Sequence, residues 1–503
     1  MNAPFFTKEK NGMFSIGYKA VIETFELPMQ SPIPLYDKKV KGFPKDNEGI
    51  TMLEALFYHI QFALKNEGVD LLFFALLSQK LEEEQLIELV QIKHTGETAR
   101  RIWFLVEFAS KKTLPIPDLK YRKEYVNALD ENIQFGLSEG IVSKRHRVIN
   151  NLPGTSDFCP LATKTDEIVK YTEKYKGFSI SSLFVSSDTN TILIEKMAYS
   201  LLLKDSKSSF IIEGEKINNR RAQEFAKVLR KAGKHLVTDA FLLSLQQEIM
   251  KGSKFNKLGF RTEGGFIGEH DYETGEPIPS HISARHEDIA PLMNGLYKSI
   301  SLVESDSNFD SMIAAATVAF GFVNIHPFFD GNGRVHRYLI NHILSLKKIS
   351  LPNGTFPISA AIRYHIEAYS KVLSAYSNSI IDYIDWVETE DLNVKVLSDS
   401  AVYYRFFDAT AFSLFLYECF DYAITVLIPN ELTLTFHFNA FKEKVKAQYD
   451  MEEHHYSLLF NYLEQGNGLL SKNAIKKFFN EYSPDDITYF ENCYQEVKAE
   501  KTL

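Results

Sequence analysis

Cysteine is scarce in this sequence of 503 residues, and its placement excludes two kinds of site. The three cysteines, Cys159, Cys419 and Cys493, lie far apart, form no CxxC pair and are odd in number. A disulfide framework or a zinc site is therefore not expected, and a reducing compartment is indicated. The N-terminal residues show no basic stretch followed by an apolar core, so we expect no secretory signal peptide. These features predict a cytoplasmic protein.

Long hydrophobic runs are also missing. The most apolar segment, Met312 to Val323, is much shorter than the roughly 20 residues that a membrane-spanning helix needs. A longer candidate, Ala409 to Ile428, contains Glu418 and Asp421, which suits a buried amphipathic helix better. We therefore expect no membrane partner.

An excess of positive charge is lacking as well. The formal net charge is -9, so the molecule as a whole does not attract nucleic acid. For the basic cluster of Lys144, Arg145 and Arg147, a solvated face or a domain contact is the simpler interpretation. The segment Lys472 to Phe479 combines lysines with two phenylalanines, and this C-terminal region could be a winged-helix module touching DNA. Because basic helix faces are commonly just solvated, nucleic acid is not the expected partner.

Strand patterns are few, and helical spacing prevails. Hydrophobic residues make up 45% and charged residues 24%, which is typical of a soluble globular protein. Apolar residues recur at helical spacing, as in Leu242, Leu245 and Ile249. The best strand candidates are Thr433 to His437 and Phe260 to Ile267. We predict a mainly α fold.

Three polar stretches suggest how the chain is divided. Asn150 to Asp166 and Glu269 to Glu287 are rich in loop-forming residues, and the second predicts a long exposed loop. A polar, acidic stretch covers Val387 to Asp399. The expected regions are an N-terminal extension (1–185), a central helical domain (186–390) and a C-terminal helical region (391–503).

The segment from His326 to Arg337, HPFFDGNGRVHR, concentrates residues suited to phosphate chemistry. Upstream, Asn308 to Asn324 is strongly apolar and predicts a buried helix. Pro327 disfavours the α conformation at His326, so the helix should end there and leave the imidazole at a helix-to-loop junction. With an ordinary pKa of about 6.5, a histidine in such a place can remove a proton from an attacking hydroxyl.

The residues that follow predict an anion site. The Gly331–Gly333 turn can adopt positive φ angles, and successive N–H groups of such a turn form a nest for anions. We expect the next helix to start near Arg334, and its N-terminus adds further N–H groups. Arg334 and Arg337 are three residues apart and so share one helix face. Together these features indicate a polyphosphate site, with Asp330 as a carboxylate suited to Mg²⁺.

This segment resembles the signature of the Fic family, HPFx(D/E)GNGRxxR, at every fixed position. The resemblance extends over roughly residues 190 to 390. It implies a helical bundle with a small β-hairpin flap, here flanked by N-terminal and C-terminal helical regions. Members of the family mostly transfer AMP from ATP to a Ser, Thr or Tyr hydroxyl of a target protein. The resemblance thus implies a protein adenylyltransferase that uses Mg²⁺ and ATP.

The resemblance also implies a role for each residue of the segment. His326 would deprotonate the target hydroxyl, and Asp330 would hold Mg²⁺ against the α- and β-phosphates. Arg337 would reach the γ-phosphate, and His336 and His342 are interpreted as structural. The other phosphate contacts would come from Gly331, Asn332 (with its side-chain amide as well), Gly333 and Arg334.

An upstream segment, Ser208 to Gly214, resembles the inhibitory motif (S/T)xxxE(G/N) of Fic proteins with an N-terminal inhibitory helix, expected here at about 195–214. The resemblance implies that Glu213 pairs with Arg337 and withholds it from the γ-phosphate, while Ser209 positions the helix end. A carboxylate near a helix C-terminus opposes the helix dipole by about 0.3–1 kcal/mol, which a cationic partner would offset. A solvated carboxylate at an ordinary helix end is the alternative.

A third segment, Arg261 to Gly268, resembles the family's flap, whose strand edge can pair with an extended target segment. The proline-rich stretch that usually follows is only partly matched by His281 to Asp288. The pocket for the nucleotide base is expected at Pro357 to Tyr369, but the aromatic pattern there is unclear, so UTP or CDP-choline stays open as the donor. The expected docking residues of the flap are Phe266, Ile267 and Gly268.

Two other functions stay open. Glu213 could help a water molecule remove AMP from a target, which would make the protein a de-AMPylating hydrolase. A non-catalytic regulator is the third interpretation, but the complete motif, with His326 and Asp330 intact, argues against it. The protein itself is a candidate target, and the sequence leaves the question of a homo-oligomer open.

Overall fold

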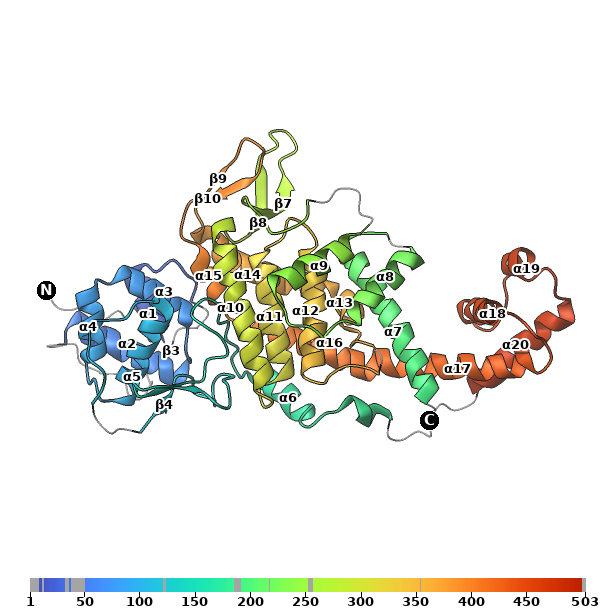
Figure 1. Ribbon diagram of the computed structural model, residues 1–503, viewed down its shortest axis with the longest axis horizontal. Coiled ribbons are helices and arrows are strands. Elements are labelled where there is room, and N and C mark those ends of the chain that lie inside the picture. The colour runs from blue at the N-terminus through green and yellow to red at the C-terminus, as the bar shows by residue number, and fades with distance from the viewer. Residues whose placement is uncertain are drawn as a thin grey trace.

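Helices form most of the chain in the computed structural model, as the sequence predicts (Figure 1). The N-terminal helices lie at one end of an elongated molecule, the C-terminal helices lie at the other, and two hairpins project from the middle (Figure 1). The structure describes residues 9–10, 13–31, 36–37, 50–120, 124–184, 191–216, 218–251, 257–352 and 354–499.

The N-terminal region packs helices beside two small sheets. The helix α2 begins at a capping box, in which Thr51 and Glu54 each bond to the other's backbone N–H. One sheet has the strand order β4-β6-β5, with β4 and β6 parallel, and the other has the order β1-β2-β3. The helices are α1 (Tyr18–Phe25), α2 (Met52–Asn66), α3 (Leu71–Lys80), α4 (Glu83–Gln91), α5 (Glu97–Ser110) and α6 (Asp166–Lys174), followed by a 3-10 helix (Ile180–Phe184). The strands are β1 (Glu9–Lys10), β2 (Met13–Phe14), β3 (Tyr36–Asp37), β4 (Val126–Asn127), β5 (Ile141–Ser143) and β6 (Val148–Asn150).

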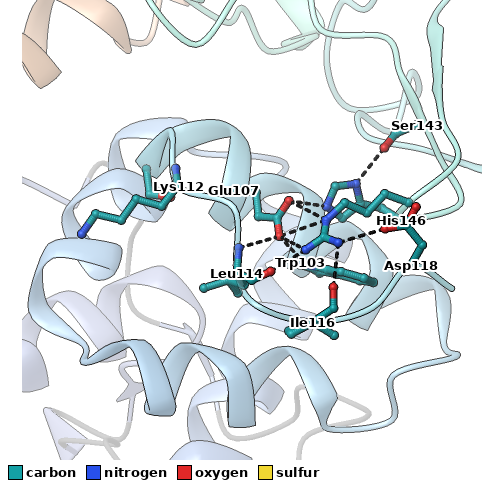
Figure 2. A network of polar contacts seen from close by, with 10 residues as sticks. Trp103, Glu107, Lys112, Leu114, Ile116, Asp118, Ser143 and His146 are labelled. Atoms are coloured by element: carbon teal, nitrogen blue, oxygen red, sulfur yellow. Dashed lines mark hydrogen bonds and ion pairs between the residues drawn. The ribbon is translucent and has the colours of Figure 1, made fainter.

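Glu107 on α5 is the centre of a polar network in this region (Figure 2). Arg145 Nη2 and Trp103 Nε1 each donate to its carboxylate at 2.8 Å, and His146 Nε2 lies 2.9 Å away. Burial by itself would raise the pKa of Glu107, but the bonds from His146, Arg145 and Trp103 outweigh it and hold the pKa at about 2. The basic cluster at 144–147 is therefore not simply a solvated face, because Arg145 and His146 tie it to α5.

The central region is a bundle around α11, whose residues from Met312 to Ile325 are all buried. Asp310 caps this uncharged helix by accepting hydrogen bonds from the N–H groups of Met312 and Ile313. Its neighbours include α10, α12 and α16, and Phe320 stacks on Phe412 with ring centroids 4.3 Å apart. The helices are α7 (Thr191–Ile212), α8 (Asn219–Leu229), α9 (Asp239–Met250), α10 (His286–Ser305), α11 (Ser311–Ile325), α12 (Asn332–Leu346), α13 (Ile358–Tyr364), α14 (Ile366–Ile380), α15 (Ala401–Arg405) and α16 (Thr410–Tyr422).

Two antiparallel hairpins stand beside this bundle. They are β7 (Phe266–His270) with β8 (Pro277–Ile282), and β9 (Trp386–Glu388) with β10 (Val394–Val396). The predicted long loop over Glu269 to Glu287 is wrong, because most of it forms the β7–β8 hairpin and the start of α10. Pro277 and Pro279 lie on β8 and have no N–H group to donate. Because the sheet has only two strands, one edge of β8 has no partner strand, and a missing donor is tolerated there.

The C-terminal region is helical. Its elements are a π-helical turn (Ala423–Leu427) and the helices α17 (Ile428–Lys446), α18 (Glu453–Gln465), α19 (Lys472–Phe478) and α20 (Pro484–Ala499). Thr433 to His437 lies inside α17, so this strand prediction is wrong; packing of α17 against α7 and α20 overrides the local β propensity. No strand occurs in residues 397–499, all of which the structure describes, so the wing of a winged-helix module is not found there.

The hydrophobic cores show which parts of the chain fold together. The main core extends from Tyr18 to Ile428, and a second core extends from Phe441 to Val497. The sequence places a division near residue 390, whereas the cores divide within α17. The helices α15 and α16 therefore pack with the central bundle.

One continuous helical stretch, Thr410–Lys446, is long and apolar enough to cross a membrane. Its most apolar window has a mean hydropathy of 1.6, and 56% of that window is buried inside the protein. A core helix of a soluble protein has the same length and composition, so this stretch is weak support for a membrane span.

Candidate active site

His326 terminates α11 in the left-handed conformation, with φ 52° and ψ 57°. Pro327 disfavours the α conformation at the residue before it, so the helix ends where the sequence predicts. The imidazole Nδ1 lies 3.3 Å from the carbonyl oxygen of Val323, which can only accept a hydrogen bond. This contact favours the tautomer that carries its proton on Nδ1, and it leaves Nε2 as the basic nitrogen.

Arg261 fixes the backbone around His326, a role that the sequence does not indicate. Its Nε donates to the carbonyl of His326 at 2.6 Å, and its Nη2 donates to the carbonyl of Ala284 at 2.7 Å. Its own backbone N–H donates to the carbonyl of Pro327 at 2.8 Å, and the residue is only 6% exposed. One buried guanidinium therefore joins the start of the flap to the end of α11. An arginine at the start of the flap-like segment is its only sequence signal, and that signal is not specific.

The surroundings of His326 favour its neutral form. Burial lowers the pKa of His326 to about 3, and the nearby His281 and Arg261 shift it in the same direction. The two histidine rings lie 6.4 Å apart, and His281 Nε2 lies 2.9 Å from the carbonyl oxygen of Asn324. The imidazole of His326 is therefore unprotonated across the physiological pH range.

Asn332 closes the loop that follows His326. Its Oδ1 accepts the N–H of Phe328 at 2.9 Å, and its Nδ2 donates to the carbonyl of Phe328 at 2.8 Å. The side chain is buried in the loop, with 2% exposure. Both ends of the amide are thus bonded to the backbone of Phe328, and the predicted contact between this amide and a phosphate stays a prediction.

The predicted anion site coincides with the N-terminus of α12. This helix begins at Asn332, two residues before the predicted start at Arg334, and Gly331 precedes it with φ 90°. Gly333 lies in the first turn, so the N–H groups there belong to the helix end and not to a separate nest. A Cβ atom on Gly333 would lie 2.2 Å from Glu213 Oε1, so only glycine allows this carboxylate to come so close.

Glu213 and Ser209 both contact Arg337. Arg337 Nη2 lies 2.7 Å from Glu213 Oε1 and also donates to the carbonyl of Ser209 at 2.7 Å. Arg337 Nε donates to the hydroxyl of Ser209 at 2.9 Å, and Arg337 is only 1% exposed. Gly214 ends this segment with φ 72°. The structure thus brings together the three residues that the resemblance pairs.

Glu215 engages the second predicted phosphate arginine. Its Oε1 lies 2.8 Å from Arg334 Nη1, and its Oε2 accepts from Arg221 Nη1, on α8, at 2.8 Å. The sequence predicts no role for Glu215 or Arg221, because neither has a diagnostic spacing from the signature. In the folded chain, both predicted phosphate arginines of α12 are paired with carboxylates.

Asp330 is the predicted metal ligand. Its Oδ1 accepts the N–H of Gly331 at 2.6 Å and lies 3.8 Å from Arg334 Nη2, and the side chain is 47% exposed. Among the described residues, no group of three or more His, Cys, Asp or Glu side chains could hold a metal ion. Mg²⁺ often takes only one or two carboxylates and fills its shell with water and phosphate oxygens. Asp330 therefore fits a Mg²⁺ shared with a nucleotide, and not one that the protein holds alone.

The β7–β8 hairpin carries the predicted docking residues. Their partners on β8 are Ile282 for Phe266, His281 for Ile267 and Pro279 for Gly268. Ile267 is 45% exposed. The β9–β10 hairpin supports the flap from the side, where Asn393 Nδ2 donates to the carbonyl of Gly264 at 3.0 Å. A bulge between Ile267 and Gly268 interrupts the ladder at the centre of the predicted docking edge.

Two further histidines occupy structural positions. His336 and His342 are both 0% exposed; His336 Nδ1 lies 2.8 Å from the carbonyl oxygen of Ala319, and His342 Nδ1 accepts the N–H of Gly233 at 3.1 Å. Pro357 to Tyr369 forms α13 and the first turn of α14, with α13 packed against α7. Its role as a base pocket stays a prediction.

Comparison with known proteins identifies the domain. Residues 237–344, which span α9 to α12 and hold the whole signature, match the model of the Fic/DOC family. Residues 237–344 are therefore a Fic/DOC family domain, and Fic domains generally transfer AMP or other nucleotide groups to proteins. No curated protein matches the chain.

Two solved structures are similar to the chain. One is a Fic family protein from Desulfovibrio desulfuricans G20, with 18% identity, a TM-score of 0.34, and coverage of 63% of this chain and 85% of that chain. The other is a Fic domain containing signaling protein from Bacteroides thetaiotaomicron VPI-5482, with 17% identity, a TM-score of 0.35, and coverage of 54% of this chain and 95% of that chain.

Proposed function

We propose that this protein transfers AMP from Mg–ATP to a Ser, Thr or Tyr hydroxyl of a protein, and that Glu213 inhibits the transfer. One observation carries the proposal. The Glu213 carboxylate lies against Gly333 at the N-terminus of α12 and is bound by the buried Arg337. An anion thus occupies the point where helix N–H groups and a guanidinium converge, and a phosphate has the charge and the acceptor oxygens to replace it.

The proposed reaction is an in-line displacement at the α-phosphorus. His326 Nε2 accepts the proton of the target hydroxyl while the hydroxyl oxygen forms a bond to the α-phosphorus. The bond from that phosphorus to the α,β-bridging oxygen breaks, and pyrophosphate leaves. Arg334, Arg337 and the N–H groups of α12 stabilise the charge on the phosphate oxygens. Mg²⁺, held by Asp330, would supply further charge neutralisation when bound.

The β7 strand is the proposed docking edge for the target. Among the described strands, β7 pairs only with β8, so its other edge can accept an extended segment through main-chain hydrogen bonds. The exposed Ile267 offers an apolar contact on that strand. Arg261 joins the flap to His326, so a docked segment would be held at a fixed position relative to the base.

A flat pH profile is expected for the reaction. Because the pKa of His326 is lowered to about 3, the base stays deprotonated as the pH falls from 8 to 6. A histidine with an ordinary pKa of about 6.5 would lose about three quarters of its basic form by pH 6. Initial labelling rates of the Glu213→Gly variant across this range test the point, and an inflection near pH 6.5 would contradict it.

Asp330→Asn is expected to weaken the response to Mg²⁺. The amide oxygen can still accept the N–H of Gly331, so the loop is retained, but the negative charge that attracts the cation is lost. The Mg²⁺ concentration for half-maximal labelling should rise by at least about tenfold, as for other changes around metal ligands. A titration against the parent protein measures this, with Glu263→Gln as the control because that carboxylate pairs with the exposed Lys257. An unchanged titration curve removes Asp330 from the metal site.

Self-labelling tests the transfer without a known target. The Glu213→Gly variant is incubated with Mg²⁺ and ATP that is labelled on either the α- or the γ-phosphate. Covalent label from the α-phosphate alone is the expected result, since pyrophosphate carries the γ-phosphate away. Label from the γ-phosphate would indicate phosphoryl transfer, and label from UTP or CDP-choline but not ATP would replace the proposed donor.

A further inference from the structure

Glu215 is shared between two guanidinium groups that come from different helices. Its Oε1 lies 2.8 Å from Arg334 Nη1, and its Oε2 accepts from Arg221 Nη1 at 2.8 Å. Since the two oxygens belong to one carboxylate, both arginines converge on the same small anion. Arg334 is a proposed phosphate ligand, so Arg221 faces the same point in the site.

Phe210 fixes this convergence. The guanidinium carbon of Arg221 lies 4.8 Å from the centre of the Phe210 ring, and that of Arg334 lies 5.2 Å from it. Phe210 is 0% exposed, so the ring is a rigid support for both cations. The two arginines are therefore oriented by packing and not only by their contact with Glu215.

Both arginines have N–H donors that make no hydrogen bond among the described residues. Arg221 Nε and Nη2 and Arg334 Nε are buried atoms without a hydrogen-bond partner among the described residues. Arg334 is only 3% exposed. Buried donors without partners are costly, and a ligand with more acceptor oxygens than a carboxylate would satisfy them. A phosphate group has such oxygens and a higher charge.

Given the nucleotidyl transfer proposed above, on which this inference rests, we propose that Arg221 is a third phosphate-binding arginine of the nucleotide site. Arg221, Arg334 and Arg337 form the binding cradle for the polyphosphate. Glu213 and Glu215 occupy it as two carboxylates in place of phosphate groups. Arg221 lies on α8, outside the 237–344 stretch that matches the family, so it is a feature of this chain's own upstream helices.

A purely structural role makes a different prediction. If Arg221 only holds Glu215 in place, its removal has no effect once Glu215 has lost its charge. If Arg221 binds phosphate, its removal still weakens ATP binding in that background. The comparison is therefore made in the Glu213→Gly/Glu215→Gln double variant, with and without Arg221→Gln.

The experiment measures the affinities of Mg–ATP and of AMP for these variants by titration calorimetry. The double variant should bind ATP more tightly than Glu213→Gly alone, because Glu215 no longer competes for Arg334. Arg221→Gln in the double variant should weaken ATP binding about tenfold, the usual scale for a charge-assisted hydrogen bond. AMP, which lacks the β- and γ-phosphates, should bind equally well with and without Arg221.

The matched control is Arg220→Gln. Arg220 is the neighbouring arginine on α8, is 89% exposed and pairs only loosely with Glu224 at 3.4 Å. It should leave ATP affinity unchanged, and Arg221→Lys should restore part of the affinity that Arg221→Gln loses. Melting temperatures identify any variant that fails to fold, and Arg221→Lys then provides the comparison.

Equal ATP affinity with and without Arg221 in the double variant overturns the inference. An equal loss for ATP and AMP also overturns it, because the effect would then not depend on the β- and γ-phosphates. The affinities can be measured whether or not the protein catalyses nucleotidyl transfer. A further outcome is that ATP affinity depends on Arg221 while no protein acquires the label from the α-phosphate of ATP. That result would support this inference and contradict the proposed transfer.

Discussion

His326→Ala is expected to lower the rate of self-labelling by about 10²–10⁴-fold, the usual contribution of a general base. The effect should be on the chemical step, since the imidazole contacts no residue of the phosphate cradle. Its Nδ1 faces the carbonyl of Val323, and its Nε2 is the nitrogen that would take the proton. The measurement is a single-turnover rate with α-labelled ATP in the Glu213→Gly background.

Two controls separate a lost base from a damaged fold. ATP affinity should stay within about twofold of the parent, because Arg334, Arg337 and the N-terminus of α12 are unchanged. His326→Asn should be as inactive as His326→Ala, because an amide offers no basic nitrogen. A His326→Ala protein that binds ATP normally and labels at the parental rate would remove His326 from the mechanism.

Glu213→Gly is expected to raise self-labelling by roughly 5–150-fold, the range of free-energy coupling between competing sites. The change removes the carboxylate that lies 2.7 Å from Arg337 Nη2 and against the first turn of α12. Arg337 keeps its contacts with Ser209, so its guanidinium stays oriented while the anion position becomes vacant. The gain should appear in ATP affinity as well as in labelling rate.

A second variant separates the effect of the size of the Glu213 side chain from the effect of its charge. Glu213→Gln keeps most of the volume but loses the ion pair, so it should activate less than Glu213→Gly. Glu224→Gln is the matched control, since Glu224 pairs with the exposed Arg220 away from the site. Equal labelling by the parent and Glu213→Gly would end the inhibitory role of Glu213. Loss of AMP from a labelled target in Mg²⁺ without nucleotide would instead favour the hydrolase.

The signature could be located from sequence because its residues are contiguous. Pro327 and Gly331 constrain the backbone locally, and Arg334 and Arg337 are placed on one face by helix geometry alone. These local rules missed the start of α12 by two residues, since Asn332 closes the loop through contacts with Phe328 that the sequence pattern does not reveal. The pairing of Glu213 with Arg337 needed the family resemblance, because 124 residues separate the two partners.

The remaining residues of the site depend on long-range packing. Arg261, Arg221 and Glu215 acquire their roles only when the flap, α8 and the end of α7 meet α11 and α12. No spacing rule relates these elements, and each residue type is common on protein surfaces. The wrong strand at Thr433 to His437 has a related cause, because its β-branched and aromatic residues fit the packed faces of α17 equally well.

The stacking of Phe320 on Phe412 limits how the chain can be shortened for laboratory work. A fragment limited to residues 237–344, which match the family, or one that ends at residue 390, would lack α16. The face of α11 that α16 covers would then be a large apolar surface exposed to water. Such a fragment should aggregate on expression. Truncation is tolerable only beyond α17, because this helix packs against α7, and it should remove α18, α19 and α20 as one piece. The stretch that matches the family is thus shorter than the shortest fragment that we expect to fold independently.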